Sequence, residues 1–137
     1  LEVVVLDNSA RTANDAAESL KTEVGSIVKS LLLRTKTSFL LCLVAGDKRC
    51  SLNKIKKLLN QKDVSMANAD QVKEITGFTI GGVSPIGHLN KIDIFIDESL
   101  KRFSNVFAAA GHPNSIFKIS FEKLCKITNG LIKDISE

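Results

Sequence analysis

Two apolar runs joined by a short polar link constrain the fold of this chain most strongly. Residues 26–34 read SIVKSLLLR and residues 38–46 read SFLLCLVAG. Apolar runs of this length fit buried strands, and the three-residue link TKT at 35–37 is short enough for a hairpin. The sequence therefore predicts a β-hairpin that is largely buried in the core.

Lys29 does not fit a buried strand. It would share one strand face with Ile27, Leu31 and Leu33, because side chains alternate along a strand. Burying an unpaired ammonium group is costly. Two interpretations stay open from this segment: the face lines a pocket where the ammonium group meets an anionic or oxygen-rich ligand, or Lys29 lies on an edge strand and reaches water along its aliphatic stem.

The rest of the chain alternates between strand and helix patterns. Strands are expected over 1–7, 91–97, 105–111 and 114–120, with a short extended piece at 64–67; helices are expected over 11–25, 51–61, 68–77 and 120–130, with a helical turn or two at 98–103. Candidate caps are Thr12, Ser51, Asn68 and Ser120, with Asp97 before the helical turn. Without strict strand–helix–strand alternation, the expected class is α+β, a mixed sheet with helices packed on it.

Length and composition bound the class of protein. The 137 residues suit one domain over 1–137, and 44% hydrophobic and 25% charged residues are ordinary for a soluble globular protein. The longest apolar run, 39–46, is far below the roughly 18 residues of a membrane span. The chain begins at Leu1, inside an apolar segment, so we expect a truncated N-terminus. No membrane partner and no signal peptide are expected.

The cysteines and histidines argue against several kinds of site. Cys42, Cys50 and Cys125 form no CxxC pair, which favours a reduced, cytoplasmic protein. Cys42 lies in an apolar strand and is interpreted as inert core. His88 and His112 are far apart and belong to no metal-binding pattern. We therefore expect no metal and no cofactor.

The segment FTIGGVSPIGHLNK at 78–91 is the second unusual feature. Gly81 and Gly82 allow positive φ or close approach of the backbone to a ligand, and Pro85 fixes the chain. Free N–H groups of such a loop can bind a carbonyl or a phosphate; a plain turn between two strands is the other interpretation. The segment matches no GxxxxGK[ST], GxGxxG or GxSxG motif.

Four segments in order resemble the YbaK/EbsC family, free-standing relatives of the editing domain of bacterial prolyl-tRNA synthetases. They are VGSIVKSLLLR, LCLVAGDKR, ANADQVKEITGFTIGGVSPIGH and IFIDESLKRFSNVFAAAGHPNSIFKISFEKL, within residues 12–130. The resemblance implies a strongly curved, partly barrel-like mixed sheet surrounded by helices. It also implies an aminoacyl-tRNA deacylase, which hydrolyses the ester of mischarged aminoacyl-tRNA, with tRNA(Pro)-type errors expected.

The resemblance also implies roles for residues. Lys29 falls on the lysine of the family and would bind the terminal adenosine or its phosphate. The GxxxP loop maps to Gly81, Gly82, Val83, Ser84 and Pro85, whose backbone would position the aminoacyl carbonyl and the ribose hydroxyls. In several members of this family water attacks with help from the substrate's 2′-hydroxyl, which fits the lack of an evident Ser/His/Asp or Cys/His set. The protein would act by positioning and electrostatics.

The segments SPIGH at 84–88 and AAAGHPN at 108–114 depart from the best-known Cys-specific members of the family. The identity of the edited amino acid therefore stays open. His88 either contacts the substrate or caps the loop. The segment Gly111, His112, Pro113 and Asn114 either forms the far wall of the pocket or is a simple turn.

Binding of the tRNA acceptor end requires contacts to phosphates. Lys48, Arg49, Lys54 and Lys57, with Lys56 and Lys62 nearby, form a basic segment that we expect to dock it; a solvated helix face is the other interpretation. A net charge of only +4 gives weak electrostatic affinity, so an aminoacyl-tRNA synthetase or an elongation factor is an expected partner. The alternative function is a non-catalytic module that binds the aminoacyl-adenosine end.

Overall fold

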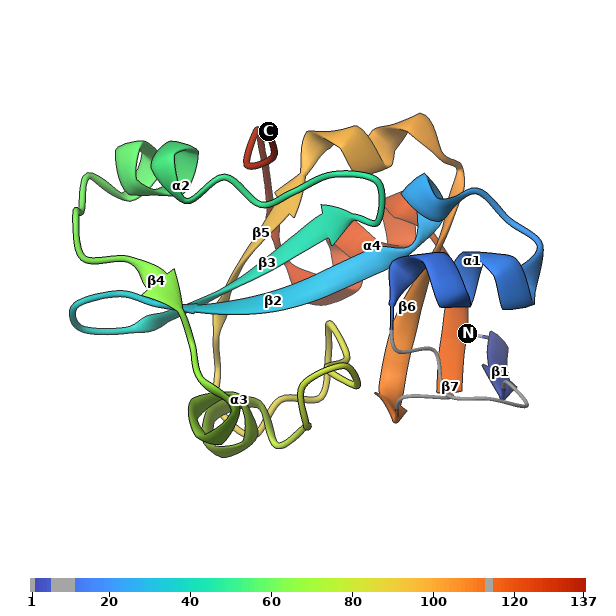
Figure 1. Cartoon of the computed structure of the whole chain (residues 1–137), viewed down its shortest axis with the longest axis horizontal. Coiled ribbons are helices and arrows are strands. Elements are labelled where there is room, and N and C mark those ends of the chain that lie inside the picture. The colour runs from blue at the N-terminus through green and yellow to red at the C-terminus, as the bar shows by residue number, and fades with distance from the viewer. Residues whose placement is uncertain (1, 6–11, 113–114) are drawn as a thin grey trace.

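A computed structural model of the chain describes residues 2–5, 12–112 and 115–137 (Figure 1). Its strands are β1 (Glu2–Val5), β2 (Val28–Arg34), β3 (Phe39–Ala45), β4 (Ser65–Met66), β5 (Asp93–Asp97), β6 (Asn105–His112), β7 (Ser115–Ser120) and β8 (Leu131–Lys133). Its α-helices are α1 (Ala13–Leu20), α2 (Leu52–Leu59), α3 (Ala69–Thr76) and α4 (Phe121–Thr128), and its 3₁₀ helices are η1 (Val24–Ser26) and η2 (Glu98–Arg102).

The described strands form two sheets. One is a five-stranded mixed sheet in the order β4-β2-β3-β5-β8, which crosses the middle of Figure 1, and the other is a three-stranded sheet in the order β1-β7-β6. The predicted hairpin forms the antiparallel pair β2–β3, whereas β3–β5 and β5–β8 pair in parallel. The sheets meet at a parallel bridge between Ile27 and Phe107.

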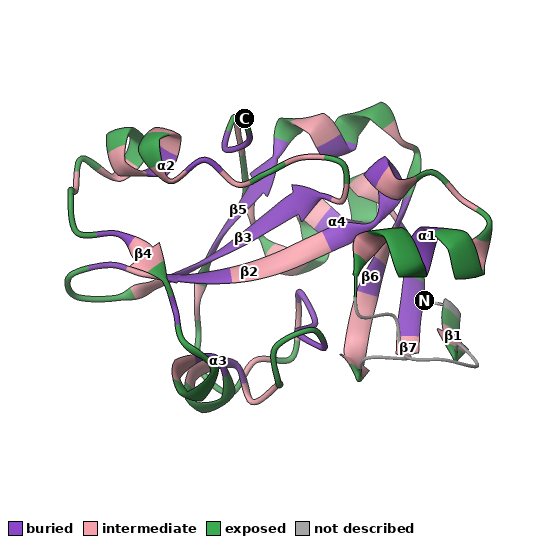
Figure 2. Cartoon of the chain, in the orientation of Figure 1, coloured by how far each residue is buried: buried purple, intermediate pink, exposed green. Residues whose placement is uncertain are grey.

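Strand β3 has core on both faces, which explains its continuous apolar sequence. Leu41 and Leu43 face a cluster that includes residues of α3, α4, β6 and β7. Cys42 and Val44 face a second cluster with Ile55 of α2. Figure 2 accordingly shows β3 and β5 as buried along most of their length. The interpretation of Cys42 as core is confirmed, because its side chain is fully buried.

Helix α1 covers the three-stranded sheet. Its alanines Ala16 and Ala17 are buried and form a third cluster with Ile27 and Ile116 of β7. The cap of this helix is as predicted, since the Thr12 hydroxyl accepts a hydrogen bond from the Asp15 N–H at 3.1 Å. The caps predicted at three further residues are also confirmed: Ser51, Asn68 and Ser120. Local chemistry thus fixes where each helix begins.

Asp97 links the end of β5 to the C-terminal segment. The predicted cap is confirmed, because its carboxylate accepts a hydrogen bond from the Ser99 N–H at 3.2 Å. The same fully buried carboxylate also accepts from the Ile135 N–H and the Ser136 hydroxyl, both at 2.9 Å. Residues 135–137 in turn bond to the chain at 49–51 through backbone hydrogen bonds. The C-terminus therefore supports the segment that follows β3.

The α+β class and the mixed sheet are confirmed. The partly barrel-like closure is not confirmed, since the described strands form two sheets joined by one bridge. The predicted first strand is found over the part described, 2–5, and residues 1, 6 and 7 lie outside the described residues. Strand β8 was not predicted, because three residues are too few to show a period.

Candidate functional site

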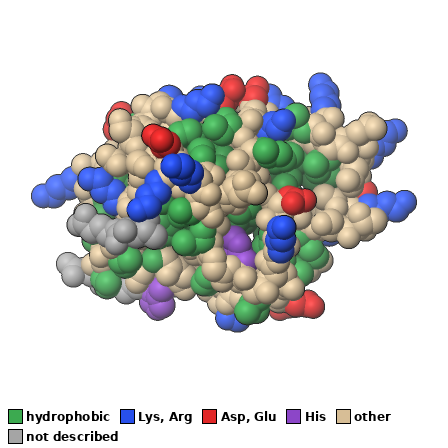
Figure 3. Space-filling view, turned by 180° about the vertical axis from the view of Figure 1, so that it is seen from behind, with side chains coloured by type: hydrophobic (Ala, Val, Ile, Leu, Met, Phe, Trp, Pro, Cys, Tyr) green, Lys and Arg blue, Asp and Glu red, His purple; other side chains and the backbone are tan. Residues whose placement is uncertain are grey.

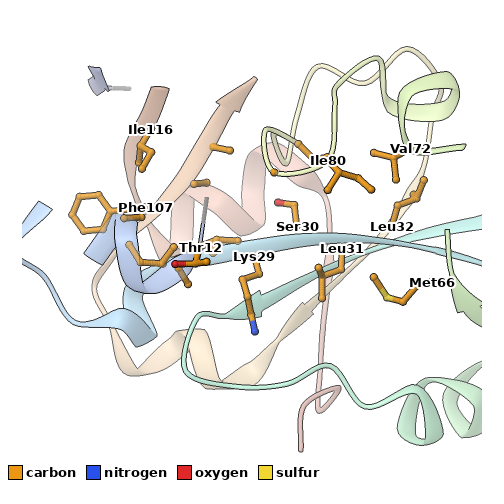
Figure 4. Close-up of a pocket in the computed structure, with 18 of the residues that line it drawn as sticks. Thr12, Lys29, Ser30, Leu31, Leu32, Met66, Val72, Ile80, Phe107 and Ile116 are labelled. Atoms are coloured by element: carbon orange, nitrogen blue, oxygen red, sulfur yellow. The ribbon is translucent and has the colours of Figure 1, made fainter. Parts of the chain in front are cut away.

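A cavity of about 390 Å³ lies along the outer edge of β2 (Figure 4). Six consecutive residues, 27–32, line it. Because neighbouring side chains of a strand point to opposite faces, a cavity can meet six residues in a row only along the strand edge. The other walls come from α1, from β6 and β7, from the region of β4 and α3, and from the glycine loop; they include Ala13, Phe107, Met66, Val72 and Gly81.

The topology leaves this edge of β2 open. On its outer side β2 pairs with β4 only at Leu33 and Arg34, and just before β2 the residue Ile27 forms a bridge with Phe107 of β6. Between these points, no strand of the described part of the chain pairs with the outer edge of β2. The cavity therefore lies between the two sheets. The pairing of β2 with β4 bounds it at one end, and the bridge between Ile27 and Phe107 bounds it at the other.

Lys29 is among the residues that line the cavity. Its ammonium group donates a hydrogen bond to the carbonyl oxygen of Lys48, and in Figure 4 its side chain points away from that of Ser30. Burial lowers the pKa of Lys29, partly offset by the nearby Cys50 and Asp47. Lys29 therefore lies at the cavity, as the pocket interpretation expects, but its ammonium group bonds within the protein, and its role toward a ligand stays a prediction.

Only part of the GxxxP loop reaches the cavity. Gly81 and Val83 line it, and Gly81 has a positive φ of 88°. Gly82, Ser84 and Pro85 are buried but are not among the lining residues.

His88 holds the glycine loop in shape. Its Nε2 donates to the carbonyl oxygen of Ser84 at 2.6 Å, and its ring meets Phe78 edge-on with 6.1 Å between centroids. His88 is not among the residues that line the cavity, so its position matches the loop-capping interpretation.

The wall contributed by β6 lies earlier in the strand than the sequence suggested. Phe107, Ala108 and Ala109 line the cavity, whereas Gly111 and His112 do not. Gly111 instead has a φ of 91°, and a Cβ atom there would lie 2.9 Å from a ring carbon of Phe78. Pro113 and Asn114 lie outside the described residues. Sequence reasoning missed the alanines because small apolar residues in a strand carry no distinctive signal.

Ser30 was also missed. Its side chain lines the cavity from the face of β2 opposite to Lys29 (Figure 4). A single serine in an apolar strand resembles any tolerated polar residue, and only the open edge beside it distinguishes it.

The predicted docking lysines and arginine do not line the cavity, and they differ in their contacts. Lys54 is engaged, with its ammonium group 2.9 Å from an Asp134 carboxylate oxygen and 2.7 Å from the Ser136 carbonyl oxygen. Lys48 is half-buried, and Arg49 and Lys57 are exposed. Figure 3 shows Lys and Arg side chains at separate places on the face it presents.

The described residues contain no group of three or more His, Cys, Asp or Glu side chains placed to hold a metal ion. Among the same residues, no helix has the length and apolar character needed to cross a membrane.

The described part of the chain combines two sheets with a pocket along one strand edge, and a lysine and a glycine loop contribute to its lining. Residues 7–127 match the family model of the aminoacyl-tRNA editing domain. The chain belongs to this family, and the predicted enzyme class, aminoacyl-tRNA deacylase, is that of the family.

Similar proteins support the assignment. The uncharacterized protein YwhH of Bacillus subtilis is 32% identical over 93% of this chain and 81% of its own length. A protein of Enterococcus faecalis named "Putative Cys-tRNA(Pro)/Cys-tRNA(Cys) deacylase EbsC" is 29% identical over 91% of this chain and 77% of its own. A crystal structure of "a putative trans-editing enzyme for prolyl tRNA synthetase" superposes with a TM-score of 0.95 and 38% identity, covering 100% of this chain and 87% of that one. The predicted YbaK/EbsC relationship is confirmed.

Proposed function

We propose that this chain is a trans-editing hydrolase that releases the amino acid from mischarged aminoacyl-tRNA of the tRNA(Pro) type. One observation carries the proposal: Lys29 and two residues of the GxxxP loop, Gly81 and Val83, line one cavity in a chain of the editing-domain family. The names of EbsC and of the trans-editing relative support the substrate class, since both concern tRNA(Pro) or prolyl-tRNA synthetase.

The cavity suits the acylated end of a tRNA. Its volume of about 390 Å³ and its largely apolar lining with a few polar groups are typical of small-ligand sites. A whole tRNA cannot enter, so only the aminoacyl group and part of the terminal adenosine would occupy it. The rest of the tRNA would lie outside, where Arg49 and Lys57 are exposed and free to approach phosphates. Lys54 would contribute less, because Asp134 already neutralises it.

The proposed chemistry is ester hydrolysis by water. The water oxygen bonds to the ester carbonyl carbon, the bond from that carbon to the ribose oxygen breaks, and the ribose hydroxyl leaves with a proton. The neighbouring 2′-hydroxyl of the substrate assists the water. Lys29 would exchange its contact with the Lys48 carbonyl for a phosphate or ribose oxygen of the substrate. Backbone N–H groups near Gly81 would orient the ester carbonyl, which is catalysis by positioning and electrostatics.

An aminoacyl-tRNA synthetase or an elongation factor as the partner, and a cytoplasmic location, stay predictions. The modest net charge of +4 supports the need for a partner that raises the local concentration of tRNA.

The test is deacylation of a panel of charged tRNAs that includes Cys-, Ala-, Ser- and Thr-tRNA. The proteins compared are the wild type, Lys29→Ala and the control Lys36→Ala, which removes an exposed lysine from the β2–β3 turn. We expect one species to be hydrolysed by the wild type and the control, and the rate to fall about 100-fold or more in Lys29→Ala. If the folded wild type hydrolyses no species but binds an aminoacyl-adenosine analogue, the chain is a binding module and the proposal is wrong.

A further inference from the structure

Ser30 has a polar side chain with an unexplained environment. Its hydroxyl oxygen is buried, and among the described residues it is the one buried side-chain nitrogen or oxygen atom without a hydrogen-bond partner. Buried polar atoms in folded proteins nearly always have a partner, because leaving one unpaired costs stability. The side chain also lines the cavity (Figure 4). This oxygen is therefore a candidate partner for a ligand, which would reach it once the side chain turns about χ1.

The backbone of Ser30 faces the same way. In an antiparallel strand the N–H and C=O groups of one residue point to the same side, and the side alternates from residue to residue. The Gly46 N–H donates to the Ile27 carbonyl oxygen at 2.7 Å, so the backbone N–H and C=O groups of odd-numbered residues in this strand point toward β3. The Ala67 N–H donates to the Leu32 carbonyl oxygen at 3.0 Å, so the backbone groups of even-numbered residues point away from β3, toward the outer edge of β2. The N–H and C=O groups of Ser30 therefore point to the open edge of β2.

This edge is accessible beside the cavity. Ser30 is only half-buried as a residue although its hydroxyl oxygen is buried. Its exposed surface therefore belongs to its backbone and Cβ atom. No strand of the described residues pairs with this edge at Ser30. A donor and an acceptor of the backbone are thus presented side by side to whatever occupies the cavity.

We propose that Ser30 binds the aminoacyl group of the substrate as a strand binds one residue of a neighbouring strand. The α-amino group donates to the Ser30 carbonyl oxygen, and the ester carbonyl oxygen accepts from the Ser30 N–H. This is the double hydrogen bond of an antiparallel residue pair, the contact by which extended peptides add to sheet edges. The inference rests on the proposed function and adds the group that recognises the amino acid itself.

The hydroxyl of Ser30 completes the arrangement. An amino group carries more than one hydrogen, and rotation about χ1 lets the Ser30 oxygen accept a second hydrogen bond from it. The charge of the cavity lining does not oppose an amino group there. Lys29 is the one charged residue among the described residues that line the cavity, and its side chain leaves β2 on the side opposite to that of Ser30, while the contact proposed for its ammonium group is with a phosphate or ribose oxygen. The ester carbonyl, held by an N–H donor, is polarised for attack.

The experiment compares two non-hydrolysable probes, 3′-deoxy-3′-(alanylamino)adenosine and 3′-deoxy-3′-(propionylamino)adenosine. They differ only in the α-amino group. Each is titrated into ¹⁵N-labelled protein, which gives a Kd and the shift of the Ser30 amide signal in one measurement. We expect the alanyl probe to bind wild type about tenfold or more tightly than the propionyl probe. The Ser30 amide signal shifts with both probes.

Two variants separate the hydroxyl from the backbone. Ser30→Ala should reduce the preference for the alanyl probe severalfold while the amide of residue 30 still shifts, and Ser30→Thr should restore the preference. Well-dispersed spectra of both variants establish that they fold. Equal Kd values for the two probes, or a Ser30 amide that stays fixed while other cavity residues shift, overturns the inference.

Failure of this inference and failure of the proposed function give different results. Deacylation by the wild type that is lost in Lys29→Ala, together with an unmoved Ser30 amide, leaves the hydrolase and removes the Ser30 contact. Deacylation of no charged tRNA, together with probe binding at Ser30, removes the hydrolase and leaves the contact. Absence of binding by either probe contradicts the inference directly.

Discussion

Asp97→Asn tests how the C-terminal residues 135–137 are held against residues 48–51, which include Lys48, whose carbonyl oxygen accepts from Lys29. The Asp97 carboxylate is fully buried and accepts hydrogen bonds from Ser99, Ile135 and Ser136. The substitution keeps the size of the side chain but replaces one oxygen by an NH₂ group. A serine hydroxyl can turn to accept from it, whereas a backbone N–H cannot. At least one buried donor is therefore left without an acceptor.

The expected cost is about 3 kcal/mol, because hydrogen bonds to a charged group contribute about 1.5–3 kcal/mol and an unpaired buried donor costs about 1–3 kcal/mol. For a chain of 137 residues this corresponds to a fall in Tm of roughly 10 °C. The control Asp134→Asn makes the same chemical change at a 54% exposed carboxylate that pairs with Lys54. Its expected cost is about 0.5 kcal/mol, a Tm change of about 2 °C.

The pH dependence gives a second, independent check. Burial raises the pKa of Asp97, but the hydrogen bonds that its carboxylate accepts lower the pKa by more. The pKa of Asp97 in the folded protein therefore lies below the ordinary value. A carboxyl group with a lowered folded-state pKa stabilises the fold above its unfolded pKa of about 3.9, and this contribution is lost as the pH falls through the folded value. The stability difference between wild type and Asp97→Asn should therefore shrink below about pH 4.

The assay is thermal and urea unfolding followed by circular dichroism at pH 7 and at steps down to pH 3. Equal stability of Asp97→Asn and Asp134→Asn at pH 7 would refute the reasoning. A difference that does not shrink in acid would show that the stabilisation comes from packing and not from the charge.

Two further predictions concern single positions. Gly111→Ala should lower the free energy of unfolding in urea by about 1 kcal/mol more than Gly81→Ala. Both glycines have a positive φ, but only a Cβ atom at Gly111 would meet the Phe78 ring, at 2.9 Å. Equal effects of the two substitutions would contradict this contact. Cys50 should react with iodoacetamide before Cys125 at pH 7, because a hydrogen bond with a neighbouring thiol lowers the pKa of Cys50 whereas burial raises that of Cys125. Mass spectrometry of the alkylated peptides decides the order, and faster labelling of Cys125 would count against it.

Local patterns in the sequence predicted the local structure well. The hairpin of β2 and β3 follows from two apolar runs and a short link, and the cap at Asn68 follows from its side chain, which forms a capping box with Gln71. The parallel pairing of β3 with β5 was not predictable, because it joins segments about 50 residues apart and depends on the packing of everything between them.

The candidate site was predictable only in part. Lys29 was noticeable because a charge interrupts an apolar run, and Gly81 because glycines cluster beside a proline. Ser30 and Ala108 carry no such signal. They belong to the cavity because two sheets leave one strand edge open, and that follows from tertiary structure alone.

In the proposed mechanism the protein positions the ester while the substrate's own 2′-hydroxyl assists the attacking water. The most direct measurement is single-turnover deacylation of the best charged tRNA of the panel, with its terminal adenosine carrying either a 2′-hydroxyl or a 2′-deoxy ribose. We expect the 2′-deoxy substrate to bind with similar affinity but to be hydrolysed about 100-fold or more slowly. Equal rates for the two substrates would mean that a group of the protein activates the water, and would contradict the proposed mechanism.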